Sequence, residues 1–251
     1  MSSPSIDMVY GLHAVRLLLT RQPQRVARVY LQAGRHDPRA GEIESLAHGA
    51  QRPVERLDAR RFESRLGNVV HQGVMAEVTP LRAWREEDLF EALAKASDPL
   101  LLALDGVQDP HNLGACLRTA DACGVLALIV PRDRAAPLNA TARKVAAGAA
   151  ENTPVVTVTN LARTLSLLKD AGLWVVGADA EGSQSAQQID LTGPRVLVLG
   201  AEGAGLRQLT RQRCDWLARL PSLGAVESLN VSVATGMLLY EALRQRSRSE
   251  P

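Results

Sequence analysis

From residue 100 onward, short apolar segments alternate with segments of helical spacing, and this alternation constrains the fold more than any other feature. The apolar segments are almost continuously hydrophobic, which is typical of strands buried on both faces of a sheet. Strands that alternate with helices predict an α/β fold in which helices cover both faces of a mostly parallel sheet. The predicted strands are LLALDG, VLALIVP, PVVTVT, LWVVGADA, RVLVLGAEG and WLARLPS; the predicted helices lie in NLGACLRTADACG, TARKVAAGAA, LARTLSLLKDAG (with Asn160 as N-cap) and VSVATGMLLYEAL.

The first third of the chain reads as a separate, smaller α/β domain over residues 1–78. Helical spacing occurs in GLHAVRLLLT, near residues 37–49, and after Asp58, which is a good N-cap residue. ARVYLQA and GVMAEV have the composition of strands. The polar stretch 79–97 predicts a linker with a short amphipathic helix, and residues 98–251 form the second domain.

The length of the apolar runs, the N-terminal segment and the cysteine spacing exclude several classes of protein. No run of the chain approaches the ~20 apolar residues that span a bilayer, and no secretory signal is visible at the N-terminus. The cysteines, Cys116, Cys123 and Cys214, have no metal-ligand spacing, and their odd number fits a reducing compartment. We therefore expect a cytoplasmic protein that has no metal and no membrane partner.

The basic residues are unevenly distributed. Residues 1–77 hold 11 Lys and Arg against 8 Asp and Glu, whereas residues 98–251 hold 15 of each kind. Of the 29 basic residues 26 are arginine, whose planar fork suits phosphate. This distribution is compatible with a polyanionic partner for the first domain, but genome composition could produce the same arginine bias.

Three loops of the second domain follow predicted strands, where ligands of such sheets bind. The first loop leads into a helix that carries Asn112 and Arg118, which an Asn cap and a solvated arginine would also explain. The second is GAEGAGL, residues 200–206. Its glycine order is G-x-x-G-x-G rather than the G-x-G-x-x-G of dinucleotide folds. Glu202 would repel a pyrophosphate, but it suits a ribose or a cationic ligand.

The third loop leads from Leu220 and Pro221 to Ser228 and Asn230, directly before the last helix. Ser and Asn both accept hydrogen bonds from the first turn of a helix, so either residue can begin the helix that ends near Arg246. That helix is apolar around most of its circumference, which indicates burial on more than one side. A partner subunit would supply the second surface.

The three loops together resemble the SpoU superfamily of RNA ribose 2′-O-methyltransferases. NLGACLR matches the first motif of that family, N-x-x-x-x-x-R; GAEGAGL matches the second, and SLNVS matches the run before the last helix. YGLHAV, VHQGVMAEV, LDGVQDPHNLGACLRTADACGV and LNATARKVAAGAAE extend the resemblance over essentially the whole chain. They resemble most the members that methylate a guanosine in the peptidyl-transferase loop of 23S rRNA.

The resemblance implies features that spacing does not show. Family members bind S-adenosylmethionine in a trefoil knot made by the C-terminal segment and are homodimers with the active site at the subunit interface. Their N-terminal domain is similar to a ribosomal-protein RNA-binding fold. By motif position, the expected catalytic residues are Asn112, Arg118, Glu202, Ser228 and Asn230, and the expected donor-binding residues are Gly200, Ala201, Gly203, Leu220, Pro221 and Leu229.

The implied reaction is attack of a ribose 2′-oxygen on the sulfonium methyl group. The hydroxyl is a poor acid, so the site has to align it and help remove its proton. Because a guanidinium keeps its proton in proteins, we expect Arg118 to bind the phosphate of the target and to stabilise developing charge rather than act as the base. Asn112 would orient Arg118 or the ribose, and Glu202 would order the donor loop or an arginine. Ser228 and Asn230 would begin the last helix and also face the donor and the target.

Two other classes of function are open at this point. A non-catalytic RNA-binding protein would explain the first domain but not the three polar loops of the second. A dinucleotide oxidoreductase is disfavoured by the glycine order. Within the methyltransferases, a tRNA ribose methylase is the main alternative.

Overall fold

The computed structural model describes residues 7–34, 37–67, 69, 71–79, 83–222, 224 and 228–247. The chain divides into two compact units, Met1–Arg82 and Ala83–Pro251. The short helix expected within a linker over residues 79–97 is α4 (Glu86–Leu93), and it packs into the core of the second unit through Leu89, which is fully buried. The second unit therefore begins at residue 83 instead of residue 98.

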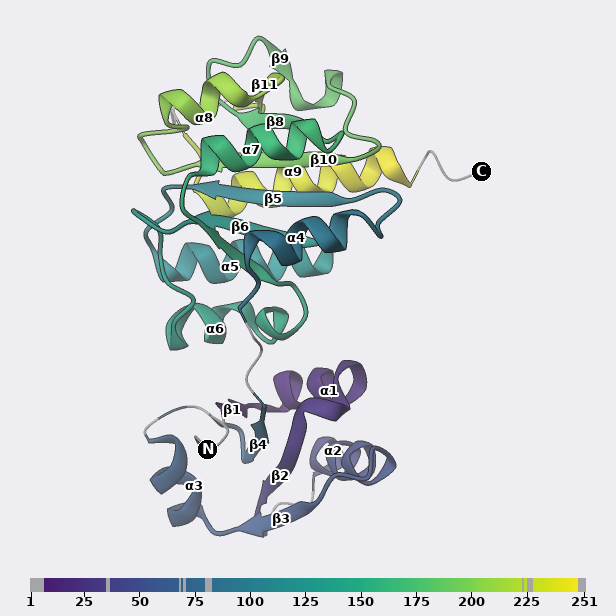
Figure 1. The fold of residues 1–251 in the computed structure, drawn as a ribbon. Coiled ribbons are helices and arrows are strands. Elements are labelled where there is room, and N and C mark those ends of the chain that lie inside the picture. Colours follow the sequence, from purple (N-terminus) through teal and green to yellow (C-terminus); the bar gives the residue numbers. More distant parts are fainter. Residues whose placement is uncertain are drawn as a thin grey trace. The chain divides into compact units, whose positions relative to one another are not determined.

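The first unit is a four-stranded mixed sheet with three helices (Figure 1). Its strand order is β1-β4-β2-β3, with β2 and β3 parallel and the other pairs antiparallel. Alternate residues of the strands face two apolar clusters, one with α1 and α2 and one with α3. As expected, Asp58 caps α3 by accepting from the backbone N–H of Arg61 at 2.9 Å. The elements are β1 (Asp7–Tyr10), α1 (Leu12–Arg21), the 3₁₀ turn η1 (Pro23–Arg25), β2 (Val26–Gln32), α2 (Pro38–Gly49), β3 (Val54–Leu57), α3 (Ala59–Leu66) and β4 (Val74–Val78).

The second unit contains a seven-stranded sheet in the order β7-β6-β5-β10-β8-β11-β9, and every pairing in it is parallel. This confirms the fold class expected from the alternation of strands and helices. Its elements after α4 are β5 (Leu100–Asp105), α5 (Pro110–Ala122), β6 (Ala127–Pro131), α6 (Ala140–Ala146), η2 (Ala149–Glu151), β7 (Val155–Val158), α7 (Leu161–Asp170), β8 (Trp174–Ala178), β9 (Gln184–Ser185), η3 (Ala186–Gln188), β10 (Arg195–Gly200), α8 (Gln208–Arg213), β11 (Trp216–Arg219) and α9 (Val231–Arg246).

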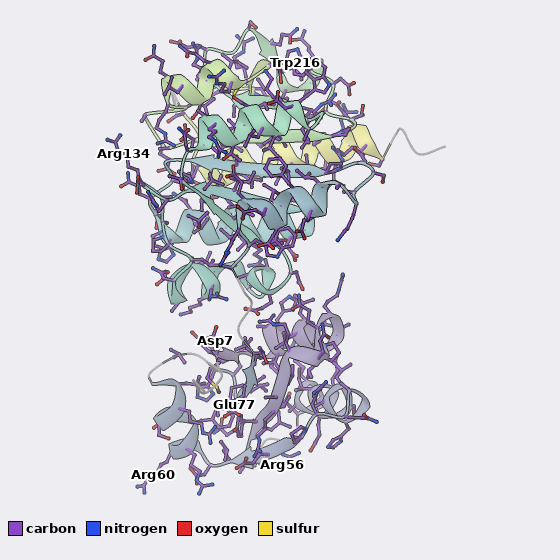
Figure 2. The ribbon with its side chains drawn as sticks, viewed as in Figure 1. Asp7, Arg56, Arg60, Glu77, Arg134 and Trp216 are labelled. Carbon is purple, nitrogen blue, oxygen red and sulfur yellow. The ribbon has the colours of Figure 1, made fainter. Side chains whose placement is uncertain are left out.

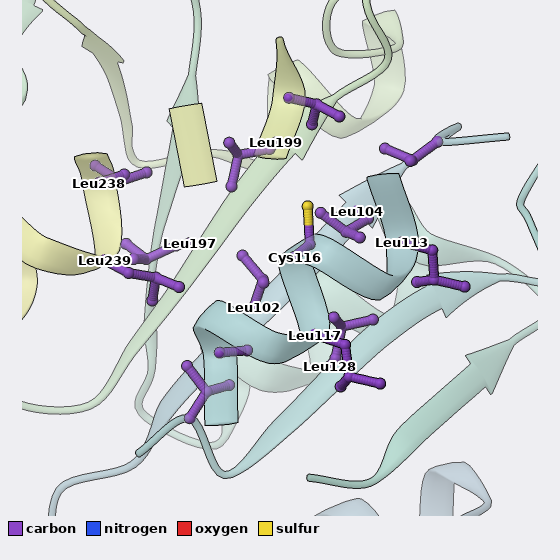
Figure 3. Packing of buried hydrophobic residues seen from close by; sticks show 14 of the residues in the cluster. Leu102, Leu104, Leu113, Cys116, Leu117, Leu128, Leu197, Leu199, Leu238 and Leu239 are labelled. Atoms are coloured by element: carbon purple, nitrogen blue, oxygen red, sulfur yellow. The ribbon is translucent and has the colours of Figure 1, made fainter. Parts of the chain in front are cut away.

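The side chains of each central strand alternate between two cores because successive residues of a strand point to opposite faces. Leu102 and Leu104 pack against α5, α6 and α9, whereas Leu101 and Ala103 pack against α4 and α7. Figure 3 shows Cys116 of α5 within the first of these cores, among leucines of α5, α9 and the central strands. The strands are therefore apolar along their whole length because both faces are covered.

Four local features differ from what the sequence indicated. The helix expected over TARKVAAGAA stops at Ala146, because Ala147 has a left-handed φ of 51° and a 3₁₀ turn follows. Helix α8 and strand β9 were not expected. The N-cap of α5 is Asp109, whose carboxylate accepts from the N–H of His111 at 2.9 Å, so Asn112 is not a cap.

None of the helices in the described ranges is both long enough and apolar enough to cross a bilayer. Within the same ranges, no group of three or more His, Cys, Asp or Glu side chains is arranged to hold a metal ion.

Helix α5 approaches α6 closely at Gly114, which gives a direct test of the packing. A Cβ atom there would lie 2.5 Å from the carbonyl oxygen of Ala142 and 2.8 Å from Cβ of Val145. We expect Gly114→Ala to lower the free energy of unfolding by about 1–3 kcal/mol through overpacking, measured by urea titration. The control is Gly41→Ala in α2, where a Cβ atom meets nothing within 4 Å. That change should stabilise by about 0.5–1 kcal/mol, since Gly is costly within a helix. Equal effects of the two changes would contradict the close contact.

Candidate functional site

The candidate site lies where β5 and β10, neighbours at the centre of the sheet, reach their carboxyl ends. Asp105 ends β5 and Gly200 ends β10, and these two residues pair directly in the register of the two strands. The loop after β5 leads into α5, and the loop after β10 carries the glycine-rich segment (Figure 1). The loops that carry the first and second motifs therefore start side by side, at one edge of the sheet.

A buried carboxylate fixes the far end of the glycine-rich loop. Asp105 is 1% exposed and accepts a hydrogen bond from the backbone N–H of Arg207 at 2.9 Å, and its other oxygen accepts from the guanidinium of Arg207. A buried carboxylate is stable only with such donors. Sequence reasoning missed this pair; the signal was an acidic residue directly after the apolar run LLAL.

The loop between Gly200 and Arg207 closes on itself. Ala201 and Gly205 form an isolated bridge, with the N–H of Gly205 donating to the carbonyl of Ala201 at 2.9 Å. A Cβ atom on Gly200 would collide with the backbone of Gly205 and Leu206. The return of the loop therefore requires a glycine at position 200.

Glu202, at the exposed tip of the loop, holds three elements together. Its Oε1 accepts from the side-chain amide of Asn112 at 3.2 Å, from the side-chain amide of Asn230, and from the N–H of Val231 at 3.4 Å. Asn230 also donates to the side-chain oxygen of Asn112 at 3.0 Å. We call Asn112, Glu202 and Asn230 the amide–carboxylate cluster. It joins residues 118 positions apart in the sequence and includes one residue from each of the three motifs.

Asn230 has a second role as the N-cap of α9. Its side-chain oxygen accepts from the N–H of Ser232 at 2.9 Å, as expected from the sequence. Ser228 is exposed and has no hydrogen-bond partner among the described residues, so the capping role falls to Asn230 alone. The start of α9 also places its positive dipole end beside Glu202, whose Oε1 accepts from the N–H of Val231.

Arg118 lies outside the amide–carboxylate cluster. It is exposed on α5 and has no hydrogen-bond or ion-pair partner in the described part of the chain. Six residues turn an α-helix by about 600°, so Asn112 and Arg118 point about 120° apart. Within one chain, Asn112 therefore orients Glu202 and Asn230 and does not orient Arg118.

The remaining expected donor-binding residues lie within the glycine-rich loop and in the segment between β11 and α9. Leu220 and Leu229 are half-buried, and Pro221 is exposed. Gly203 has a left-handed φ of 72°, which its lack of a side chain permits. The segment between Pro221 and Leu229 includes residues 223 and 225–227, which lie outside the described residues.

The cysteines do not supply a nucleophile near this site. Burial raises the pKa of the Cys116 thiol to about 11 and that of Cys214 to about 12, so both are protonated at neutral pH. Sγ of Cys116 lies 3.3 Å from the hydroxyl of Thr235 in the interface of α5 and α9. These thiols are parts of the core.

Comparison with known proteins identifies two matching families. A model of the SpoU rRNA Methylase family matches residues 99–240, and a model described as RNA 2′-O ribose methyltransferase substrate binding matches residues 8–84. The 23S rRNA (guanosine-2′-O-)-methyltransferase RlmB of Pseudomonas aeruginosa is 58% identical over 97% of this chain and 98% of its own length. RlmB of Escherichia coli K12 is 51% identical over 96% and 99%.

Solved structures show the same architecture. The SpoU methyltransferase AviRb from Streptomyces viridochromogenes, crystallised with the cofactor AdoMet, matches with a TM-score of 0.76 and 25% identity. The match covers 97% of this chain and 92% of that one.

The contact between Asn230 and Glu202 can be tested by a change of one atom. In Asn230→Asp the cap acceptor is kept, but an amide donor becomes a carboxylate beside Glu202. We expect a loss of about 1 kcal/mol in the free energy of unfolding at pH 8, modest because both side chains are exposed. Adding Glu202→Gln should recover most of it, since the glutamine can donate to the new carboxylate. Wild-type stability in Asn230→Asp would show that the contact is absent in solution.

Proposed function

Because this chain belongs to the SpoU rRNA methylase family, we propose that it transfers a methyl group from S-adenosylmethionine to the ribose 2′-oxygen of a guanosine in 23S rRNA. The observation that carries the proposal is the amide–carboxylate cluster, which brings together one residue from each of the three motifs at the carboxyl edge of the sheet. The matched relatives that act on 23S rRNA align over both units, which favours an rRNA target over a tRNA target. We place the target guanosine in the peptidyl-transferase loop and the reaction in the cytoplasm.

The chemistry of the glycine-rich loop fits S-adenosylmethionine. Between Ala201 and Gly205 the loop presents peptide groups, and its one charged side chain, Glu202, is already held by three donors. Peptide groups and the half-buried Leu220 and Leu229 suit an adenine and a ribose better than a phosphate chain. Gly200, Ala201, Gly203 and Pro221 complete the proposed donor site. When bound, S-adenosylmethionine supplies a methyl group activated by its sulfonium centre.

Five residues have proposed roles in binding or orienting the RNA. Arg118 binds a phosphate of the target and stabilises negative charge on the 2′-oxygen, because a guanidinium stays protonated and forks onto phosphate. Asn112 and Asn230 orient the ribose, and Glu202 fixes both amides. Ser228, exposed next to this cluster in the sequence, contacts the donor or the target nucleotide.

A homodimer is part of the proposal, and α9 supports it. Val233, Tyr240 and Leu243 of α9 are 51%, 68% and 38% exposed, which leaves an apolar stripe on the side away from the core. Large exposed apolar patches typically mark interaction sites. The family resemblance implies an active site at the subunit interface, and Arg118 is exposed with no partner among the described residues of its own chain. Arg118 would then act in the site of the partner subunit.

A trefoil knot in the C-terminal segment is also proposed on the family resemblance.

The two units have separate proposed tasks, recognition of RNA by the first and donor binding by the second. The full chain should convert one guanosine of a 23S rRNA transcript to 2′-O-methylguanosine, mapped by primer extension at low nucleotide concentration. A fragment of residues 83–251, which keeps α4, should bind S-adenosylmethionine with near-normal affinity in calorimetry yet methylate the transcript poorly. Methylation of tRNA in place of the transcript would refute the rRNA assignment. Full activity of the fragment would refute the task of the first unit.

The role of Arg118 separates two mechanisms. Arg118→Ala should lose roughly a hundredfold to a thousandfold in turnover, the typical effect of deleting one preorganised electrostatic donor. Arg118→Lys should recover only part, because an ammonium lacks the planar fork. Single-turnover methylation across pH, with donor affinity as the control, checks both. A lysine variant that reaches the wild-type rate at high pH through a new titration would instead make residue 118 the base.

A further inference from the structure

The loop between β6 and α6 holds an arginine in an unfavourable backbone conformation. Arg134 has a φ of 59°, in the left-handed region that Gly and Asn tolerate best. Any long side chain is costly there, and a glycine would be the simpler choice for a turn. Strain of this kind often indicates that the side chain at that position has a function.

Both ends of this loop are tied to the carboxyl edge of the sheet. The N–H of Arg132 donates to the carbonyl of Val158 at 2.8 Å, and the N–H of Ala136 donates to the carbonyl of Val107 at 2.8 Å. These bonds hold the residues between them against the ends of β5 and β7. Arg134 is therefore held by its neighbours in a fixed place.

That place adjoins the candidate site. A Cβ atom built on Gly106, directly after Asp105, would lie 3.9 Å from the carbonyl oxygen of Arg134 and 3.8 Å from Cβ of Ala201. The carbonyl of Arg134 and the side chain of Ala201 thus both lie next to Gly106. The amide–carboxylate cluster begins one residue further along, at Glu202.

The guanidinium of Arg134 points into solvent (Figure 2). It has no ion pair or hydrogen bond with any residue that the structure describes. The acidic residue adjacent in the sequence, Asp133, is engaged loosely with Arg132 at 3.8 Å. Arg132 and Arg134 are both exposed, so residues 132–134 carry two arginines against one aspartate and a net positive charge.

We propose that Arg134 binds a backbone phosphate of the RNA next to the target ribose, and this inference rests on the proposed function. A planar guanidinium on an anchored loop is preorganised for a forked phosphate contact, so less entropy is lost when the RNA is bound. The strained φ is explained by that role, since the turn holds the guanidinium exposed at the rim of the site. Arg134 is then a substrate-binding residue in addition to Arg118.

The test compares Arg134→Asn, which removes the charge but tolerates the left-handed backbone, with Arg134→Lys. The control is Arg213→Gln, an exposed arginine at the end of α8, which leads into the amino end of β11. We expect Arg134→Asn to raise the KM for a 23S rRNA fragment roughly tenfold with kcat nearly unchanged. The slope of log RNA affinity against log salt concentration should become shallower by about 0.7, the value for one phosphate contact on a single strand. Arg134→Lys should recover part of the KM, and Arg213→Gln should change neither quantity. The melting temperature of Arg134→Asn should equal or exceed that of the wild type.

Filter binding of the same RNA fragment is measured in parallel with methylation. If the wild type binds the fragment through Arg134 but methylates nothing, the inference stands and the proposed function fails. If the wild type methylates and Arg134→Asn keeps its KM and salt slope, the inference fails and the function stands. A loss of S-adenosylmethionine affinity or of the dimer in Arg134→Asn, with RNA binding unchanged, would assign the arginine to the donor or to the subunit interface and overturn the proposal.

Discussion

The buried carboxylate of Asp105 is the contact on which the candidate site depends. It ends β5 beside Gly200, and it is hydrogen-bonded to both the backbone and the side chain of Arg207. A carboxylate removed from water is stable only when its oxygens are satisfied, so the chain has to return from Gly200 to Arg207 within seven residues. The glycines make this short return possible. The position of Glu202 follows from the closure of the loop.

From Glu202 the constraint extends to the end of the chain. One carboxylate oxygen accepts from α5, from Asn230 and from the first turn of α9, so the loop after β10 and two helices share one acceptor. Helix α9 packs against α5 and the sheet on one side and leaves an apolar stripe exposed on the other. Any partner that covers this stripe is linked to the glycine-rich loop through a single helix. Dimerisation and donor binding, both proposed here, would then be physically coupled.

The sequence predicted the parallel sheet correctly because strands buried on both faces have to be apolar throughout. The sequence was less informative where contacts between elements decide the local structure. Helix α4 looked like part of a linker because the stretch 79–97 is polar, yet Leu89 lies in the core. Asn112 looked like a cap, but Asp109 precedes Pro110, which is favoured in the first turn, and it takes that role. Strand β9 has two residues, too few for any periodicity.

Within the site, the sequence identified the residues of the cluster but not their arrangement. Spacing showed that Asn112, Glu202 and Asn230 follow strands, and only the fold shows that they share one hydrogen-bonded group. It also shows which chemistry this group supports. The two amides are neutral, an arginine does not take up a proton, and the buried thiols stay protonated. Glu202 is engaged as the acceptor that orders the loop. In the proposed reaction, the rate would then depend on alignment of the 2′-oxygen and on cations placed where negative charge develops. A site of this design needs exposed arginines at its rim more than it needs a strong base at its centre.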